Sequence, residues 1–332
     1  MNAVLIISEE GDSSTDWVIH WILALNGSAT RINKEISICN ITVEIGKSDI
    51  KFMYQGQPYS LSNFDAIWYR RGFVRINEVF ADNCDLDVDR SERHEIIRQV
   101  EKFKSSELFA LEEYINFLIA TKYLIGSPSG SYLNKLIVLK LAQTVGMQIP
   151  ETIVTSRKDY IKENLEKYGS VINKAINRTI SIKAGRRYIF GFTRVFGEGH
   201  LGKLSNSFFP SLFQSKIEKR YEIRIFFLFG KSHAMAIFSQ SNSKTNIDLR
   251  NYDLEKPNRC VPYKLPIPIE HKIKRLMKRL RLNSGSIDMI YTRDNKYVFI
   301  EVNPCGQFEM LSYNCNYYLE KEIAKLLTNG KK

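Results

Sequence analysis

SIDMIY (residues 286–291) and YVFIEVNP (residues 297–304) decide the fold of this chain. Both stretches alternate in the manner of β-strands, and the short Asp294-Asn295-Lys296 turn between them predicts an antiparallel hairpin. Strand and helix patterns are mixed along the rest of the chain. We therefore predict an α/β fold of the α+β type that ends in an antiparallel sheet.

Three oxygen-bearing side chains meet in the predicted hairpin, because Asp288 on the first strand lies beside Glu301 and Asn303 on the second. Side chains on a strand alternate between its two faces, so Glu301 and Asn303 share one face while Ile300 and Val302 point into the opposite layer. Magnesium prefers oxygen ligands, commonly one or two carboxylates with phosphate oxygens and water. The trio is a candidate magnesium site, and the alternative is three polar groups on a solvated sheet face.

Cations on other elements supply the positive charge that a triphosphate requires. They are Lys135 at the start of a predicted helix, Lys174 at the end of a β-rich run, Lys216 within Gln214-Ser215-Lys216-Ile217, and Arg224 within Glu222-Ile223-Arg224. Cations set on separate elements can offset the charge that develops in phosphoryl transfer to a weak carboxylate nucleophile. The alternative for each lysine taken singly is an exposed surface residue, because lysine is seldom buried.

Periodicity places the remaining elements. Predicted strands cover residues 4–7, 66–69, 171–174, 223–229 and 234–238, with hairpins over 42–54 and 180–196. Predicted helices cover residues 17–25, a long stretch from Asp89 with a capping box to Glu92, residues 134–145, residues 270–280, and a closing segment that ends near residue 327. Residues 126–130, Gly-Ser-Pro-Ser-Gly, form the clearest linker and predict the first domain boundary.

Composition narrows the class of protein. A chain of 332 residues with 44% apolar and 25% charged residues predicts a globular protein of two or three packed subdomains. The apolar runs are far shorter than the roughly 20 residues that span a bilayer, so we expect no membrane anchor, no signal peptide and a cytoplasmic location. Five cysteines without a Cys-x-x-Cys pair and five dispersed histidines argue for reduced thiols and against a zinc site. The net charge of +12 favours an anionic partner, but charge alone does not choose among nucleotide, acidic peptide, nucleic acid and membrane.

The order of the motifs resembles the ATP-grasp superfamily from about residue 128 to the end of the chain. That order is Asn134-Lys135, Lys174, Gln214 to Ile217, Glu222-Ile223-Arg224, Asp288, and then Glu301-Val302-Asn303-Pro304. Three stretches are similar to the graspetide maturases, which are microviridin-type peptide cyclases: WYRR (68–71), NPCGQF (303–308) and CNYYLEKEIA (315–324). The last is especially similar to the grasp-with-spasm subgroup.

The resemblance implies an ATP-grasp fold in three domains. These are a Rossmann-like pre-ATP-grasp domain at residues 1–128, a small central α+β domain at 129–205, and an antiparallel-sheet domain at 206–332. It also implies ATP and Mg2+ as cofactors, with Lys135 and Lys174 on the nucleotide phosphates and the Lys216-Ile217 hinge on the adenine. Gln214 and Glu222 belong to the same nucleotide site, Arg224 faces the transferred phosphate, and Asp288, Glu301 and Asn303 hold magnesium.

Arg70 and Arg71 follow the predicted strand at residues 66–69, and strand ends are a usual place for ligand contacts in α/β domains. By resemblance they hold an acidic peptide, and the alternative is two solvated arginines at a domain interface. The basic helix around residues 270–280 either guides a peptide leader or is a solvated helix face.

The activity implied is that of an ATP-dependent peptide macrocyclase. It activates Asp or Glu side chains of a ribosomally made precursor, with a leader and an acidic core, as acyl phosphates and forms esters with Thr or Ser, or amides with Lys. The expected partner is this peptide rather than nucleic acid or a membrane, and a homodimer is compatible with it. One alternative is an ATP-grasp ligase that adds free amino acids to a peptide or protein terminus. The alternative of another class is a basic nucleic-acid-binding protein, although the chain has no recognisable RNA or DNA module.

Overall fold

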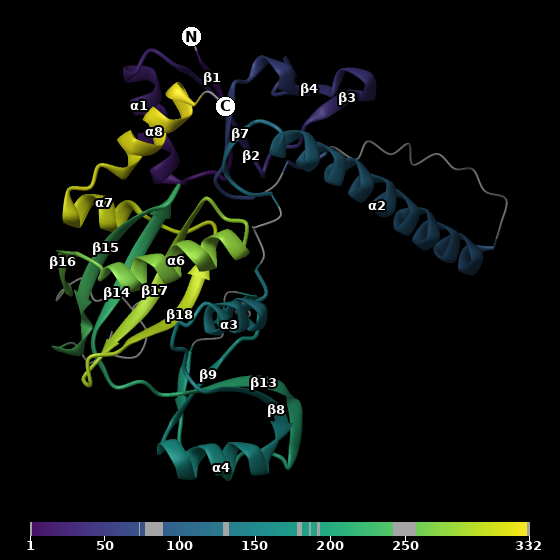
Figure 1. The fold of residues 1–332 in the computed structure, drawn as a ribbon. Coiled ribbons are helices and arrows are strands. Elements are labelled where there is room, and N and C mark those ends of the chain that lie inside the picture. The colour runs from purple at the N-terminus through teal and green to yellow at the C-terminus, as the bar shows by residue number, and fades with distance from the viewer. Residues whose placement is uncertain are drawn as a thin grey trace. The chain divides into compact units, whose positions relative to one another are not determined.

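The computed structural model describes residues 2–72, 74–76, 89–128, 133–177, 181–185, 187–190, 193–241 and 257–330 (Figure 1). The chain folds as two units, one made of residues 1–131 with 318–332 and the other of residues 132–317. Among the described helices, none has both the length and the apolar character that a membrane span needs.

The first unit is built on a parallel sheet with the strand order β2-β1-β6-β7. Its strands are β1 (Ala3–Ser8), β2 (Ser28–Asn33), β6 (Ala66–Tyr69) and β7 (Tyr123–Gly126). The strands β1 and β6 are buried almost throughout, which explains why both read as unbroken apolar runs in the sequence. Gly126 has φ +84, and a Cβ atom there would lie 2.2 Å from the Tyr69 carbonyl oxygen, so only glycine fits. The parallel sheet agrees with the predicted Rossmann-like start.

In the described part of this unit, three helices and a small second sheet complete the fold. The helices are α1 (Ser13–Ala24), α2 (Arg90–Ala120) and α8 (Leu319–Asn329), and the antiparallel strands are β3 (Cys39–Glu44), β4 (Asp49–Tyr54) and β5 (Gln57–Ser60). The strands β3 and β4 confirm the hairpin predicted over residues 42–54. Asp89 stands at the N-cap of α2 but makes no side-chain cap hydrogen bond, so the predicted capping box with Glu92 is wrong. Glu92 still lies in the first turn, where the helix dipole favours an acidic residue.

The closing helix α8 packs against α1, although the two lie at opposite ends of the sequence (Figure 1). The Lys321 ammonium lies 4.6 Å from the centre of the Trp21 ring. The division into domains at 1–128, 129–205 and 206–332 stays a prediction, and the structure gives this last helix to the first unit.

The second unit begins with α3 (Lys135–Thr144) and a four-stranded antiparallel sheet in the order β12-β9-β13-β8. The strands are β8 (Thr152–Arg157), β9 (Val171–Lys174), β12 (Arg194–Phe196) and β13 (Ser207–Ser215), joined by α4 (Lys158–Tyr168) and α5 (Glu198–Leu201). Ile161 and Leu165 of α4 bury against Val171 and Phe213 of the sheet. A separate hairpin pairs β10 (Ser181–Ala184) with β11 (Arg187–Phe190). Residues 180, 186, 191 and 192 of the predicted 180–196 hairpin, and residues 129 and 130 of the predicted linker, lie outside the described residues.

The rest of the second unit is a five-stranded antiparallel sheet in the order β16-β15-β14-β17-β18. Its strands are β14 (Lys219–Leu228), β15 (Lys231–Phe238), β16 (Arg259–Tyr263), β17 (Ser284–Thr292) and β18 (Tyr297–Asn303), and its helices are α6 (Ile267–Arg279) and α7 (Glu309–Cys315). Short 3-10 turns cover Ile45–Lys47 and Leu61–Asn63 in the first unit and Ser239–Ser241 in the second. One face of the sheet is apolar, with Ile225, Ile287 and Phe299 buried against side chains of α3 and α6. Figure 1 shows α6 lying along that face. The opposite face carries buried apolar residues such as Phe226, Met235 and Ile237 beside the charged side chains of its middle strands.

Candidate active site

Three charged side chains form a row across the middle of the five-stranded sheet. The strand register pairs Arg224 of β14 with Asp288 of β17, and Asp288 with Glu301 of β18. Arg224 Nε donates to Asp288 Oδ1 at 2.9 Å, and Arg224 Nη2 donates to Asp288 Oδ2 at 3.0 Å. Directly paired residues of antiparallel strands point to the same side, so the row lies on the face opposite the apolar layer. The two parallel hydrogen bonds fix the arginine and the aspartate in one orientation.

The Arg224–Asp288 pair is only half-buried, with 24% of the arginine side chain and 31% of the aspartate side chain exposed. Burial lowers the pKa of Arg224, but the hydrogen bonds and charge of Asp288, together with the charges of Glu222 and Glu301, outweigh it and raise the pKa. The guanidinium therefore keeps its charge and remains accessible to an anion.

A β-bulge in β18 sets the direction of Glu301. Asp288 pairs with Glu301 while the next residue, Met289, pairs with Phe299, so Ile300 is the extra residue. A bulge of this kind re-aims a side chain and is common beside active sites. Val302 joins the buried core as predicted, whereas Ile300 lies outside the core cluster, contrary to the prediction that both point into the opposite layer.

Asn303 completes the set of oxygen donors on this face. It pairs with Ser286 of β17, two residues along from the Asp288–Glu301 pair, and its Oδ1 accepts a hydrogen bond from the Cys305 N–H at 3.1 Å. Two carboxylates and one amide oxygen are the hard donors that magnesium takes, not the nitrogen and sulfur donors of zinc. In the part of the chain that the structure describes, no cluster of three or more His, Cys, Asp or Glu side chains could hold a metal. The fit to magnesium thus depends on the oxygen chemistry of this trio.

Glu222 lies on the same face of β14 as Arg224, two residues away. Its carboxylate forms an ion pair with Lys219 and accepts a hydrogen bond from the Ser239 hydroxyl at 3.1 Å. Burial raises the pKa of Glu222 more than Lys219 and Ser239 lower it, and the charge of Asp288 adds to the rise. A carboxylate held at a raised pKa by burial beside a charge pair is typical of functional sites.

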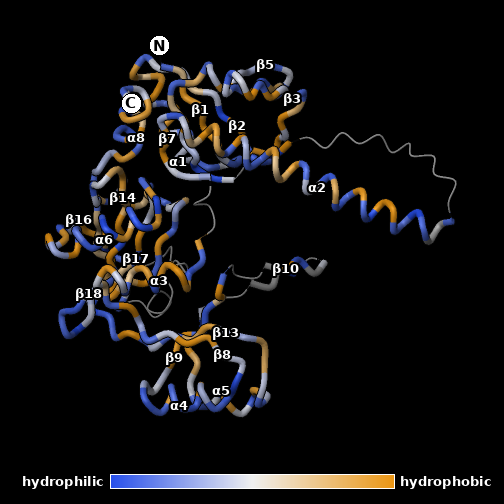
Figure 2. The backbone as a smooth tube through the Cα atoms, turned by 45° about the vertical axis from the view of Figure 1, so that its right-hand side comes forward, coloured by the Kyte–Doolittle hydropathy of each residue, from blue (hydrophilic) through white to orange (hydrophobic). Residues whose placement is uncertain are grey.

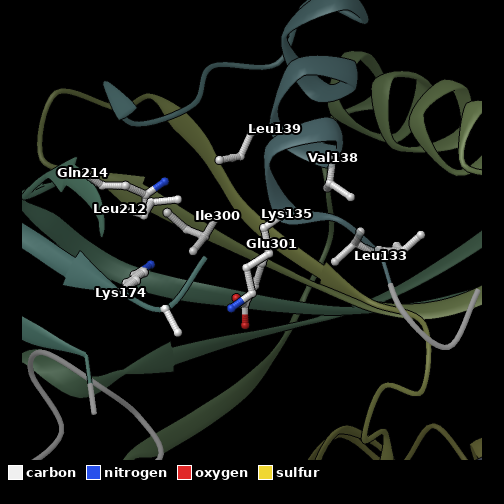
Figure 3. A pocket seen from close by; sticks show the side chains of 11 residues that line it. Leu133, Lys135, Val138, Leu139, Lys174, Leu212, Gln214, Ile300 and Glu301 are labelled. Atoms are coloured by element: carbon white, nitrogen blue, oxygen red, sulfur yellow. The ribbon is translucent and has the colours of Figure 1, made fainter. Parts of the chain in front are cut away.

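A pocket opens between α3, β9, β13 and β18 (Figure 3). Its polar lining comes from Lys135, Lys174, Gln214 and Glu301, and its apolar lining includes Leu133, Val138, Leu139, Leu212 and Ile300. An apolar pocket with a few convergent polar groups is the usual form of a small-molecule site. Figure 3 shows these side chains arriving from separate elements, so only the tertiary fold assembles them.

Local capping explains the position of Lys135. The Asn134 side chain accepts hydrogen bonds from the N–H groups of Leu136 at 3.0 Å and Ile137 at 3.4 Å, which starts α3 at Lys135. Gln214 is held by a hydrogen bond from its Nε2 to Thr152 Oγ1 at 3.0 Å. Both residues therefore enter the pocket from fixed positions.

The pocket brings together four of the site residues predicted from the sequence: Lys135, Lys174, Gln214 and Glu301. Lys216 and Ile217 belong instead to the connection between β13 and β14, where the Lys216 ammonium lies 3.5 Å from Glu218. Of the described residues that line the pocket, none is Lys216, Ile217, Glu222 or Arg224. Glu301 connects the pocket with the row of charged side chains, since it lines the pocket and also pairs with Asp288 at the end of the row.

The sequence and the fold of the chain were compared with those of known proteins. No protein-family model matches the chain, and no curated protein matches it. Solved structures match over the whole length. The RiPP-associated ATP-grasp ligase of Chryseobacterium gregarium, in complex with ADP and a leader and core peptide, is 26% identical, with a TM-score of 0.78 over 100% of this chain and 98% of that one.

The chain has the fold of an ATP-grasp ligase. Macrocyclase MdnC of Microcystis aeruginosa, bound with the precursor peptide MdnA, has the same fold at 24% identity and a TM-score of 0.75, over 99% of this chain and all of that one. ATP-grasp ligase PsnB, complexed with a minimal precursor, Mg and ADP, also has this fold. It is 15% identical, with a TM-score of 0.67 over 98% of this chain and 96% of that one. The ATP-grasp fold predicted from the sequence is thereby confirmed.

Arg70 and Arg71 lie in the first unit of the ligase, immediately after β6. Arg70 is 4% exposed, and its Nε donates to Asp12 Oδ2 at 3.0 Å, while Arg71 Nη1 donates to Glu9 Oε1 at 2.5 Å. The sequence predicted their place at the end of a strand, and the structure adds these acidic partners. A role in holding an acidic peptide stays a prediction.

Sequence reasoning missed three residues near the site of the ligase. Lys219 and Ser239 surround Glu222, and Ile300 bulges into the pocket. Lys219 stands three residues before Glu222, a spacing that alternation puts on opposite faces of a regular strand. The strand register is irregular between Lys219 and Tyr221, which allows Lys219 to form its ion pair with Glu222. No sequence signal marks that irregularity.

Proposed function

We propose that the ligase is a peptide macrocyclase, which uses ATP to join side chains within one ribosomally made precursor peptide. The observation that carries the proposal is the partly exposed row of Arg224, Asp288 and Glu301, whose last member also lines the pocket. The titles of the similar structures name ADP together with leader, core or precursor peptides, which supports a peptide as the substrate.

Asp288, Glu301 and Asn303 are proposed to hold Mg2+, because they offer two carboxylates and an amide oxygen on one sheet face. When bound, the ion would draw negative charge from the outer phosphate oxygens of ATP. The Asp288 carboxylate already accepts two hydrogen bonds from Arg224, and a carboxylate offers about four lone-pair sites, so it can serve both partners. Arg224 thus fixes the ligand and carries its own positive charge to the same place.

The pocket is proposed to bind the nucleotide. Lys135 and Lys174 would contact its phosphates, while Gln214 with the Lys216-Ile217 connection would hold the adenine among the apolar lining residues. The structure supports this for Lys135, Lys174 and Gln214 through their place in the pocket wall. Lys216 and Ile217 would act through backbone groups of the connection between β13 and β14. Glu222 is proposed to complete the nucleotide site from β14.

The proposed chemistry has two steps. A carboxylate oxygen of a precursor Asp or Glu attacks the terminal phosphorus of ATP, the bond to the ADP oxygen breaks, and an acyl phosphate forms. A hydroxyl of Thr or Ser, or the amine of Lys, then attacks the acyl carbon, loses its proton and expels phosphate. The peptide loses one water per ring, and ATP becomes ADP and phosphate. Arg224 would stabilise the charge that develops on the transferred phosphoryl group.

An acidic core peptide is proposed to contact Arg70 and Arg71. Both arginines already pair with protein carboxylates, Asp12 and Glu9, so a peptide carboxylate would have to share or replace these partners. Arg71 is the better placed of the two, because 24% of its side chain is exposed against 4% for Arg70.

The test uses the purified full chain with ATP, Mg2+ and the short acidic peptide encoded nearest to its gene. We expect ADP release and a peptide mass lower by one water per ring. The variant Asp288→Asn should lose both, whereas Asp294→Asn on the turn of the same hairpin, where 59% of the aspartate side chain is exposed, should keep them. A peptide that gains the mass of an amino acid would replace the macrocyclase by the ligase that extends a peptide end. Full activity of Asp288→Asn would remove the charged row from the mechanism.

A further inference from the structure

Close contacts hold the loop after β18 against the five-stranded sheet. This 304–308 loop connects Asn303 at the end of β18 to α7, and β18 lies next to β17 in the sheet (Figure 2). Phe308 at the far end of the loop is 1% exposed, and its ring centre lies 4.9 Å from that of Phe226 on β14. The loop is therefore anchored at one end by β18 and at the other by an aromatic contact with the sheet.

Ser286 of β17 anchors the loop between these two ends. The strand register pairs Ser286 with Asn303, and the Ser286 Oγ donates to the Gln307 carbonyl oxygen at 3.0 Å. Ser286 stands two residues before Asp288, so its side chain lies on the same face of the sheet as the proposed magnesium ligands. Ser286 is only 7% exposed, and a hydrogen bond is stronger where water does not compete for it.

Gly306 brings the backbone of the loop against Ser286. A Cβ atom at Gly306 would lie 2.1 Å from the Ser286 Oγ and 2.3 Å from the Ser286 backbone nitrogen. The backbone nitrogen cannot move without the strand, so only glycine allows this approach. The approach places the carbonyl group of the next residue, Gln307, within reach of the Ser286 hydroxyl.

The loop in turn fixes the side chain of Asn303. The Cys305 N–H donates to Asn303 Oδ1 at 3.1 Å, and only the oxygen of the amide group can accept this bond. The bond therefore determines which way round the amide lies. Asn303 is exposed, whereas Ser286 and Gly306 are buried. An amide oxygen has two lone pairs, so Oδ1 can accept from Cys305 and still bind a cation.

We propose that Ser286 is a positioning residue of the magnesium site. It holds the 304–308 loop, and Cys305 of that loop keeps the Asn303 oxygen, rather than the NH2 group, available to the ion. The inference rests on the proposed function, in which Asn303 is a magnesium ligand. Ser286 donates its single proton to Gln307, so it acts on the ion only through the loop. Groups that orient a metal ligand typically account for about 10–100-fold in metal affinity.

A serine that only stabilised the fold would contribute to the free energy of unfolding. It would leave the metal affinity of the folded protein unchanged. Ser284 offers a matched comparison, because it lies two residues before Ser286 on the same strand and is 6% exposed. Its strand partner is Leu228 of β14, not Asn303.

The first test is a calorimetric titration of the full chain with Mn2+, used as a probe for the magnesium site, in the presence of ADP. We expect Ser286→Ala to bind Mn2+ at least about tenfold more weakly than the natural sequence does. Ser284→Ala should bind it as the natural sequence does. Both variants should bind ADP alone with unchanged affinity, because the nucleotide pocket is lined by other residues. Circular dichroism checks that both variants are folded.

The second test is a double-mutant cycle on the same Mn2+ affinity. If Ser286 acts through Asn303, the combined variant Ser286→Ala with Asn303→Ala binds Mn2+ as weakly as Asn303→Ala alone, because the loop no longer has a ligand to orient. Losses that multiply in the combined variant would show that Ser286 acts by another route and would overturn the proposal.

Gly306→Ala tests the same contact from the side of the loop. It should weaken Mn2+ binding at least as much as Ser286→Ala, since the added Cβ pushes the loop away from β17. Ser286→Ala adds no atoms, so it decides the question even if Gly306→Ala does not fold. A natural chain that binds no Mn2+ with ADP would overturn the magnesium site of the proposed function and this inference with it. A natural chain that binds Mn2+, with Ser286→Ala binding it equally well, would overturn this inference alone.

Discussion

Two arginine–aspartate pairs, one in each unit, differ mainly in how far water reaches them. Arg70 and Asp12 are 4% and 6% exposed, whereas Arg224 and Asp288 are 24% and 31% exposed. Both pairs have a hydrogen bond of similar length, 3.0 Å and 2.9 Å, from the arginine Nε to the carboxylate. Burial rather than hydrogen-bond length therefore distinguishes the two pairs, because water reaches Arg224 and Asp288 much more than Arg70 and Asp12.

The Arg70–Asp12 pair is part of a sealed polar network at the end of β1. Thr15 Oγ1 donates to Asp12 Oδ2 at 2.8 Å, and the Ser8 and Thr15 hydroxyls are 2.9 Å apart. Ser8 and Thr15 are fully buried. A buried charge pair costs desolvation when it forms, but removing one partner leaves the other charge in a dry site.

The largest effect is expected for Asp12→Ala, which takes the carboxylate away from a guanidinium that is almost fully buried. We expect the free energy of unfolding of the first unit to fall by about 3–5 kcal/mol, measured by urea denaturation. Asp16→Ala in the first turn of α1, the helix that Asp12 precedes, is the control, because its pair with Arg31 leaves the aspartate side chain 55% exposed. Equal, small losses for both variants would remove the contrast between the two arginine pairs.

The second largest effect is expected in the more exposed of the two arginine–aspartate pairs. Asp288→Asn keeps the shape of the half-exposed pair but removes its charge, so we expect nucleotide-dependent turnover to fall by roughly 10²–10³. Unfolding should change by less than in Asp12→Ala, because water still reaches Arg224. A variant that loses stability as much as Asp12→Ala, while its folded fraction keeps full turnover, would assign this pair to the fold.

The smallest effect is expected in how the free energy of unfolding depends on pH through Glu222. Burial raises the pKa of Glu222, so the folded protein holds this proton to a higher pH than the unfolded chain does. Stability from this group is present below the unfolded pKa of about 4.3 and is lost as the pH rises through the folded value. Compared with the natural sequence, Glu222→Gln should therefore gain stability as the pH rises from the unfolded pKa of Glu222 to its raised folded pKa, and the difference should be constant above that.

Urea denaturation of both proteins at several pH values from 4 to 7 measures this difference. The charge of Lys219 acts on the ionised form of Glu222, so its effect belongs to the same titration and opposes that of burial. A difference that shrinks as the pH rises would mean that the Lys219 pair outweighs burial.

Local features of the site could be read from the sequence because they depend on neighbours along the chain. The alternation of residues 286–291 and 297–304 predicted the hairpin, and the register does pair Asp288 with Glu301. Asn134 before Lys135 marked the start of α3, and its side chain caps that helix. These predictions hold because strand pleating and helix capping act within a few residues.

Other features could not be read in this way. The capping box from Asp89 to Glu92 fits the sequence pattern, yet the Asp89 side chain makes no such bond. The bulge at Ile300 moves this residue out of the core that strict alternation assigns to it. A bulge depends on the partner strand, which periodicity within one strand does not report.

The sequence by itself determined which chemical groups the chain offers, namely the oxygen donors of the last hairpin and the lysines before it, and their order predicted the ATP-grasp fold. Only the tertiary structure decided which of these side chains meet, since Lys135, Lys174, Gln214 and Glu301 come from four elements that converge on one pocket. It also decided that Arg70 is sealed while Arg224 is open. The physical reason is that residue type and spacing fix local geometry, whereas burial and convergence depend on packing between segments far apart in the chain.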